Sequence, residues 1–243
     1  GSSNSHTAIL ARNMNIPAII GVGDTFLDEI RDGQSAIVDG YMGEIYLEPD
    51  KETMQNYVLK QKNDEEHRKL LQNLKGKENV TLDGTKINIF ANIGGVDNIG
   101  AVLANDAGGI GLFRSEFLYL ENADFPTEEQ QFTAYRKVLE SMAGKKVIIR
   151  TLDIGADKQA DYFGLKKEEN PALGMRAIRI CLTHPEIFRT QLRALYRASV
   201  FGKLGIMFPM ITSESEVRKV LEICDEVKSE LKQEGIEYSE NVE

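Results

Sequence analysis

Between residues 79 and 243, short apolar segments typical of buried strands alternate with amphipathic segments of helical periodicity. This alternation predicts a parallel sheet with right-handed helical crossovers. An eight-unit β/α barrel takes about 250 residues, so four units correspond to the first half of a TIM-type barrel. The expected strands are 86–92, 108–113, 146–151 and 204–210. The expected helices are 96–106, 127–143, 175–181, 185–199 and 213–233.

The alternation stops at residue 243, where a fifth strand is expected. The first 48 residues are also too short for a core of their own. We therefore expect the chain to be a piece of a larger fold. In that case the first and fourth strands have no ladder partners, and their open edges favour self-association.

The first 78 residues differ from the rest in their pattern of apolar and charged residues. Residues 1–48 predict a helix at 7–14 and brief strands and turns in the runs "PAIIGVG", "QSAIVDG" and "GEIYLEP". Residues 49–76 are highly charged, with apolar residues at roughly helical spacing, which predicts one or two linker helices. The expected parts are thus 1–48, a helical linker at 49–78, and the β/α region 79–243.

Composition excludes several classes of protein. The net charge of −9 disfavours nonspecific binding to nucleic acid or to an anionic membrane. No apolar stretch approaches the roughly 18 residues of a membrane span, and the N-terminus is no signal peptide. Cys181 and Cys224 lie far apart without metal-binding spacing. We expect reduced thiols, a cytoplasmic protein, and neither nucleic acid nor a membrane as partner.

Two arginines fall at the ends of expected strands. Arg114 follows "GGIGLF" and Arg150 follows "KVII". In parallel β/α folds the carboxyl ends of the strands hold the active site, and paired guanidinium groups bind phosphate or carboxylate well. One such arginine alone is more often a surface residue or part of a structural ion pair. Two at one edge, with Lys158 nearby, predict an anion site; Arg176 stands further on, near the start of an expected helix.

His6 stands among small polar residues in "SNSHTA", just before an expected helix. A neutral imidazole nitrogen there could accept a phosphoryl group, with the helix N-terminus favouring the anion. The alternative is a capping or ordinary surface histidine. We expect His67 to be solvated on a charged helix and His184, before Pro185, to be a helix-capping residue.

Several segments together resemble Enzyme I, the phosphoenolpyruvate–protein phosphotransferase family of the bacterial sugar phosphotransferase system. They occur in the family's order and cover nearly the whole chain. The segments are "SNSHTAILARNMNIPAIIG", "GIGLFRSEFLYL", "PTEEQQFTAYRKVL", "IIRTLDIGADK", "EENPALGMRAIRICL" and "FGKLGIMFPMI".

The resemblance implies roles for individual residues. His6 matches the histidine that takes the phosphoryl group from phosphoenolpyruvate and passes it to the carrier protein HPr. Arg114 and Arg150 match arginines that hold phosphoenolpyruvate, and Lys158 and Arg176 match polar positions of the same pocket. The implied fold is part of a phosphohistidine swivel domain at 1–48, a helical linker, and half of a barrel that dimerises. Magnesium is implied as cofactor, with its ligands beyond residue 243, and the HPr-docking subdomain is absent from this chain.

Two alternatives stay open. The chain on its own could be a catalytically inert fragment or a phosphate-binding scaffold without turnover. It could also be a relative of pyruvate phosphate dikinase or phosphoenolpyruvate synthase, which share the architecture. Their histidine motif usually reads Cys-His-Ala, where this chain has Ser5, His6 and Thr7.

Overall fold

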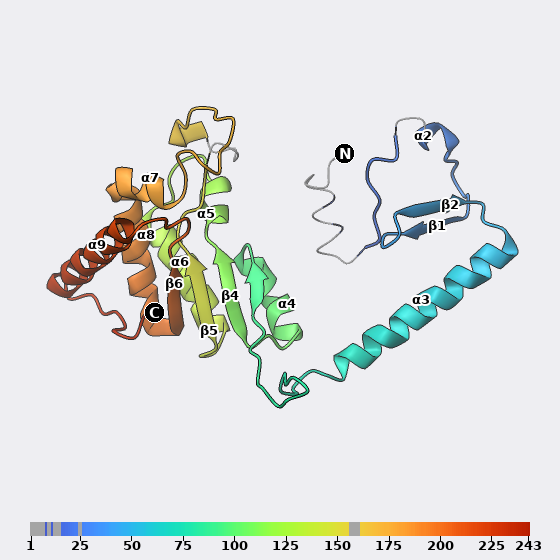
Figure 1. Ribbon diagram of the computed structural model, residues 1–243, viewed down its shortest axis with the longest axis horizontal. Coiled ribbons are helices and arrows are strands. Elements are labelled where there is room, and N and C mark those ends of the chain that lie inside the picture. Colours follow the sequence, from blue (N-terminus) through green and yellow to red (C-terminus); the bar gives the residue numbers. More distant parts are fainter. Residues whose placement is uncertain (1–7, 9–10, 12–15, 24–25, 156–160) are drawn as a thin grey trace. The chain divides into compact units, whose positions relative to one another are not determined.

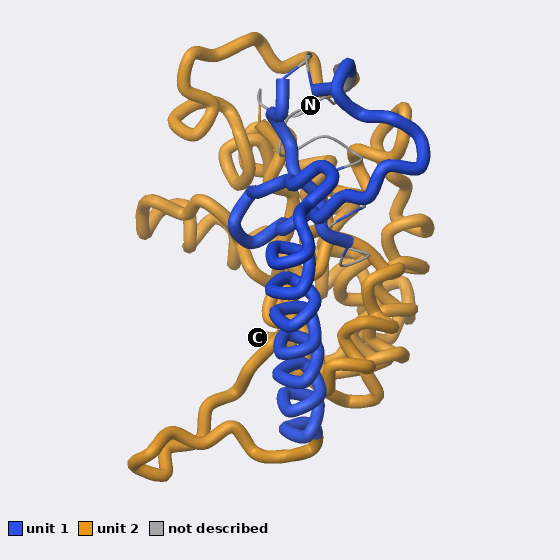
Figure 2. Tube along the Cα trace, turned by 90° about the vertical axis from the view of Figure 1, so that its right-hand side faces the viewer, with its two compact units in different colours: residues 1–75 blue, residues 76–243 orange. Residues whose placement is uncertain are grey.

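A computed structural model describes residues 8, 11, 16–23, 26–155 and 161–243 (Figure 1). The chain falls into two compact units, residues 1–75 and 76–243, which Figure 2 colours separately. The expected helix at 7–14 lies almost entirely outside the described residues; its two described members, Ala8 and Ala11, are helical.

Unit 1 contains a β-hairpin and a long helix. Strands β1 (Ala36–Asp39) and β2 (Glu44–Leu47) pair antiparallel, after the short helix α2 (Phe26–Glu29). The Asp39 carboxylate accepts hydrogen bonds from the backbone N–H groups of Tyr41 and Met42, which closes the turn. Two of the three apolar runs expected as strands are therefore strands. The third, "PAIIGVG", has no regular structure and contains two glycines of positive φ, Gly21 and Gly23.

The long helix α3 (Lys51–Gln72) is a single helix whose N-cap, Asp50, accepts a hydrogen bond from the Thr53 N–H. None of its residues is fully buried. Two side-chain contacts near its first turns join this helix to the hairpin. Lys60 forms an ion pair with Asp39, and the Tyr57 hydroxyl donates to a Glu44 carboxylate oxygen 2.8 Å away. The solvated position expected for His67 is confirmed.

Unit 2 is built on a four-stranded parallel sheet, which confirms the α/β class. The strands β3 (Ala91–Ile93), β4 (Gly109–Arg114), β5 (Lys146–Arg150) and β6 (Lys203–Met207) lie in chain order, each hydrogen-bonded to the next. Figure 1 shows β4, β5 and β6 running side by side. Because the order never reverses, the sheet is singly wound, as it would be in a barrel.

Helical segments connect these strands. Both expected capping boxes are present, at Thr127 with Gln130 and at Ser213 with Glu216. The His184 position before α8 is confirmed as an N-cap, although its side chain makes no capping hydrogen bond. The segments are η1 (Val96–Asn98), α4 (Ile99–Ala104), α5 (Glu116–Leu120), α6 (Glu128–Ser141), η2 (Asp161–Phe163), α7 (Ile178–Thr183), α8 (Pro185–Ala198), η3 (Ser199–Phe201) and α9 (Glu214–Gln233).

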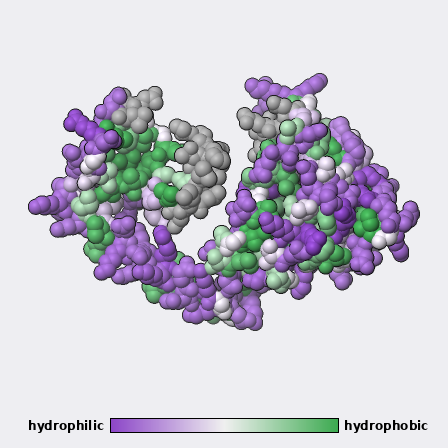
Figure 3. All heavy atoms as spheres, turned by 180° about the vertical axis from the view of Figure 1, so that it is seen from behind, coloured by the Kyte–Doolittle hydropathy of each residue, from purple (hydrophilic) through white to green (hydrophobic). Residues whose placement is uncertain are grey.

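The core of unit 2 lies between the sheet and the helices α6, α8 and α9. Alternate residues of β5, Val147 and Ile149, are fully buried against it, as are Tyr135 of α6 and Leu192 of α8. Cys181 and Cys224 are buried in the same cluster as free thiols. The visible face of unit 2 in Figure 3 is mainly hydrophilic, with separate small hydrophobic areas.

Two expectations about the sheet are wrong. The first strand covers only Ala91–Ile93, because Lys86 forms an antiparallel bridge with Val80 across a turn at Gly84. The fourth strand remains the end strand of the sheet, but its outer edge carries backbone hydrogen bonds to one residue, where none was expected. Ile206 donates its N–H to the Glu243 carbonyl, and Glu243 donates to the Leu204 carbonyl. This is the bonding pattern of one further parallel residue pair.

Ion pairs connect the helices on the outer side of unit 2. Three arginines of α8 stand four residues apart: Arg189, Arg193 and Arg197. Arg193 contacts Glu128 of α6 at 2.7 Å and Glu234, just after α9, at 2.6 Å. Among the described residues, no helix is both long and apolar enough to cross a bilayer.

A buried glutamine joins α8 to the ends of two strands. Gln191 is fully buried, and its side-chain oxygen accepts the Leu152 N–H at 2.9 Å. Its amide nitrogen donates to the Ser115 and Tyr135 hydroxyls, each at 3.0 Å. Ser115 directly follows β4 and Leu152 lies two residues after the end of β5, so one side chain bonds to the chain just beyond both strands.

We predict that Gln191→Leu lowers the free energy of unfolding by about 1–3 kcal/mol, because it leaves buried polar groups without partners. Urea unfolding monitored by circular dichroism measures the change. Gln233→Leu, at an exposed position of α9, is the matched control and should change stability by less than about 0.5 kcal/mol. Equal stability of Gln191→Leu and the parent chain would contradict the structural importance of this network.

Candidate functional site

The carboxyl edge of the unit 2 sheet carries the two arginines singled out in the sequence. Arg114 is the last residue of β4 and Arg150 the last of β5. They are paired positions in the parallel register, so their Cα atoms stand side by side on adjacent strands. The expectation that both arginines lie at one strand edge is thus confirmed as geometry.

Arg150 is held by two carboxylates. One guanidinium nitrogen contacts Glu116 at the start of α5, and another lies 2.9 Å from an oxygen of Asp153. The Arg150 side chain remains 21% exposed. The sequence predicted two converging arginines, but it did not predict that one of them would already be ion-paired.

Arg176 joins the same cluster through Asp153. Its Nε and a terminal nitrogen donate to Asp153 Oδ1 at 3.2 and 3.0 Å. Asp153 therefore lies between two guanidinium groups, with one oxygen toward each. Arg179, three residues on, donates instead to the carbonyls of Ala172 and Gly174 and so supports the loop before α7.

Arg114 has different surroundings. Its guanidinium carbon lies 5.3 Å from the ring centre of Phe117, which is within range of a cation–π contact. Its Nε is buried without a hydrogen-bond partner. Among the described residues of the chain, no carboxylate forms an ion pair with it.

Glu116 is buried beside these cations. Burial raises the pKa of its carboxyl group, and the charge and hydrogen bond of Arg150 only partly oppose that rise. Its second oxygen, Oε2, is buried without a hydrogen-bond partner. Among the described residues at this edge, Glu116 and Asp153 contact Arg150 and Arg176, and no described carboxylate pairs with Arg114. An anion is the chemical species that fits such a place.

The predicted site residues thus have different outcomes. The structure brings together Arg114, Arg150 and Arg176. His6 and Lys158 lie outside the described residues, so their placement stays a prediction. Sequence reasoning missed Glu116 and Phe117, although both follow Arg114 directly in "RSEF". Their proximity in sequence was visible, but the direction of their side chains depends on the turn into α5.

The described residues do not form a metal centre. No group of three or more histidine, cysteine, aspartate or glutamate side chains among them is arranged to hold an ion. The two carboxylates at the strand edge, Glu116 and Asp153, already contact arginines.

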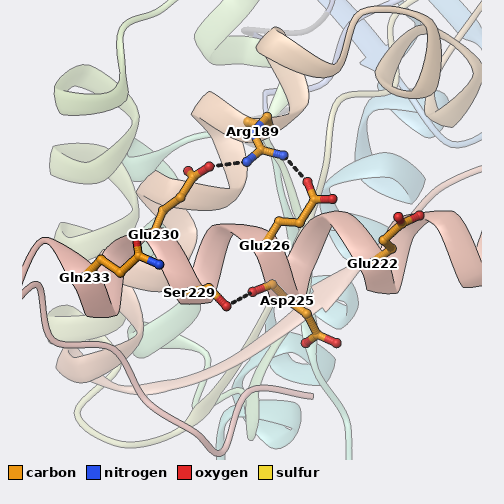
Figure 4. Close-up of a pocket in the computed structure, with 7 residues that line it drawn as sticks. All are labelled: Arg189, Glu222, Asp225, Glu226, Ser229, Glu230 and Gln233. Carbon is orange, nitrogen blue, oxygen red and sulfur yellow. Dashed lines mark hydrogen bonds and ion pairs between the residues drawn. The ribbon is translucent and has the colours of Figure 1, made fainter.

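Two hollows in unit 2 lie away from the arginine pair. One, of about 600 Å³, lies along α9 and is lined largely by carboxylates. Figure 4 shows Arg189 of α8 reaching between Glu226 and Glu230 there, so it belongs to the ion pairs between helices. The other, of about 470 Å³, is mainly aromatic and apolar; its rings include Tyr119, Phe125, Tyr162 and Phe163.

Comparison with known proteins agrees with this geometry. A family model described as "PEP-utilising enzyme, PEP-binding domain" matches residues 68–243. A second, described as "PEP-utilising enzyme, mobile domain", matches residues 1–43.

Individual relatives carry one name. Proteins called phosphoenolpyruvate-protein phosphotransferase from Staphylococcus carnosus, Staphylococcus epidermidis and Priestia megaterium are 46%, 47% and 47% identical to the chain. Each match covers 100% of the chain and 42% of the relative, so the chain spans less than half the length of these relatives. With most of its length matched by a single family model, the chain belongs to the family of PEP-utilising enzymes.

Proposed function

We propose that the chain is part of a phosphoenolpyruvate–protein phosphotransferase, Enzyme I of the sugar phosphotransferase system. The observation that carries the proposal is the side-by-side placement of Arg114 and Arg150 at the carboxyl edge of the sheet. The names of relatives 46–47% identical over the whole chain support it. In this proposal residues 1–48 belong to the swivel domain, 49–78 to a linker, and 79–243 to the first half of a barrel.

The proposed reaction moves a phosphoryl group from phosphoenolpyruvate to His6. The Arg114 and Arg150 guanidinium groups neutralise phosphate oxygens, with Arg176 and Lys158 lining the same pocket. A ring nitrogen of neutral His6 attacks phosphorus, the bond from phosphorus to the enol oxygen breaks, and pyruvate enolate leaves. Positioning and charge neutralisation supply most of the catalysis in phosphoryl transfer. HPr then takes the phosphoryl group from His6.

Magnesium stays a proposal that rests on the resemblance. The described residues do not offer a ligand set for it, so no step of the mechanism above is assigned to the ion. Its ligands would have to come from residues other than those described. The homodimer proposed for a polypeptide of full length rests on the resemblance as well.

Arg150→Ala is the direct test of the proposed site. In a polypeptide of the relatives' full length that contains these residues, we predict a fall of about 10³–10⁵-fold in the rate of phosphoryl transfer, as for arginines that stabilise a phosphoryl-transfer transition state. Rapid-quench measurement of labelled phosphohistidine gives the rate. Arg218→Ala, which removes a 77% exposed arginine of α9, is the control and should leave the rate unchanged. A loss below tenfold for Arg150→Ala would count against the role.

The alternative of an inert segment or phosphate-binding scaffold has its own test. We predict that the 243 residues alone form no phosphohistidine when mixed with magnesium and phosphoenolpyruvate labelled in its phosphate. The proposal assigns turnover to a polypeptide of more than twice this length. Acid-labile label on His6, located by mass spectrometry of peptides, would overturn the prediction and support an active segment.

Burial of Glu116 predicts a pH dependence of stability. Since its folded-state pKa is raised above the ordinary value of 4.5, the stability it contributes is present below that pH and is lost as pH rises through the folded pKa. Glu116→Gln imitates the neutral form. We therefore expect the free energy of unfolding of Glu116→Gln, relative to the parent chain, to increase as pH rises above the ordinary carboxyl pKa.

Urea unfolding at several pH values measures this difference. Glu140→Gln is the matched control, because Glu140 also pairs with an arginine but lies on the exposed side of α6, 46% exposed. A Glu116→Gln variant whose relative stability stays constant or falls as pH rises would show that Arg150 outweighs burial at this carboxyl group.

A further inference from the structure

The arginines at the strand edge are held in two different ways. Arg150 and Arg176 are held by carboxylates, which offset their charge. Arg114 is held by the face of an aromatic ring, and no described carboxylate pairs with it. A ring face orients a guanidinium group through its quadrupole but carries no net charge. Among the described residues, no carboxylate offsets the positive charge of Arg114, so that charge is available to a ligand.

Phe117 differs from the next three residues of α5 in its relation to the hydrophobic core. The next three residues of α5, Leu118, Tyr119 and Leu120, all join the hydrophobic cluster of unit 2. Phe117 is half-buried and, among the residues described, is not a member of that cluster. Its ring instead lies between the Arg114 guanidinium and the end of β3.

The position of the Phe117 ring is set by a glycine. A Cβ atom at Gly94, just after β3, would lie 2.5 Å from Cε2 and 2.9 Å from Cζ of the ring. Gly94 is buried, and its φ is not in the left-handed region, so its backbone conformation does not require glycine. The requirement is one of space. The ring packs directly on the Gly94 backbone, and a side chain at residue 94 would force the ring to shift.

We propose that Phe117, seated on Gly94, is a positioning residue that holds Arg114 toward the phosphate of the substrate without neutralising it. The inference rests on the proposed function and deepens it. In this proposal Arg114 is the arginine whose charge is available to the substrate. Arg150 already forms ion pairs with Glu116 and Asp153. The chain of contact runs from the end of β3, through the ring on α5, to the last residue of β4.

The test uses a polypeptide of the relatives' full length and phosphoenolpyruvate as the probe. Phe117→Leu keeps apolar bulk but removes the ring face, and we expect kcat/KM to fall by roughly 3- to 30-fold, the range of a cation–π contact. Phe117→Tyr keeps the ring face and should stay within about twofold of the parent. Phe125→Leu is the matched control, because this ring contacts only other aromatic rings among the described contacts.

A double-mutant cycle separates positioning from general stability. If Phe117 acts through Arg114, Phe117→Leu should cost nothing further in an Arg114→Met background. Gly94→Ala, which displaces the ring, should give the same loss as Phe117→Leu and likewise none in Arg114→Met. Thermal unfolding of each variant is recorded alongside.

The outcomes distinguish the positioning role of Phe117 from the proposed function itself. If Arg114→Met is impaired but Phe117→Leu retains the parent kcat/KM, or if the two losses simply add, the positioning role is overturned while the proposed function stands. If Arg114→Met transfers phosphate at the parent rate, the site assignment fails and the positioning role fails with it. Rescue by Phe117→Tyr together with non-additive losses supports the inference.

Discussion

The arrangement of unit 2 depends on the buried Gln191 amide. This one side chain of α8 accepts a hydrogen bond from the Leu152 N–H and donates to the Ser115 hydroxyl. Leu152 lies two residues after Arg150 at the end of β5, and Ser115 directly follows Arg114 at the end of β4. A buried polar group is costly unless all its partners are in place, so the network permits one relative position of helix and strands. The relative position of Arg114 and Arg150 follows from that constraint.

The strand edge combines cations of different character. Asp153 bridges Arg150 and Arg176, and Glu116 adds a second carboxylate to Arg150. These carboxylates hold the guanidinium groups of Arg150 and Arg176 in place, and they also lower the net positive charge of the site. Arg114 is oriented by Phe117 instead and keeps its charge. A site built in this way is rigid before any anion arrives and still attractive to one, which is what preorganised charge stabilisation requires.

Much of unit 2 could be predicted from local patterns. The capping boxes at Thr127 and Ser213 lie where the sequence placed them, because a cap involves residues only three apart. The strand expected at 86–92 is largely absent, since Lys86 pairs locally with Val80 before the chain reaches the sheet. The helix α5 was not expected, because five residues are too few to give a clear helical period. The pairing of Glu243 with β6 was missed because it depends on a contact nearly forty residues away.

The sequence alone determined that the chain alternates strands and helices and that arginines end two of the strands. Periodicity and order along the chain are local properties, so they can be read without coordinates. Only the tertiary structure decided that Arg114 and Arg150 share one register, that Glu116 and Asp153 occupy Arg150, and that Phe117 rests on Gly94 beneath Arg114. Those facts depend on side-chain directions and on packing between distant segments, which no single stretch of sequence contains.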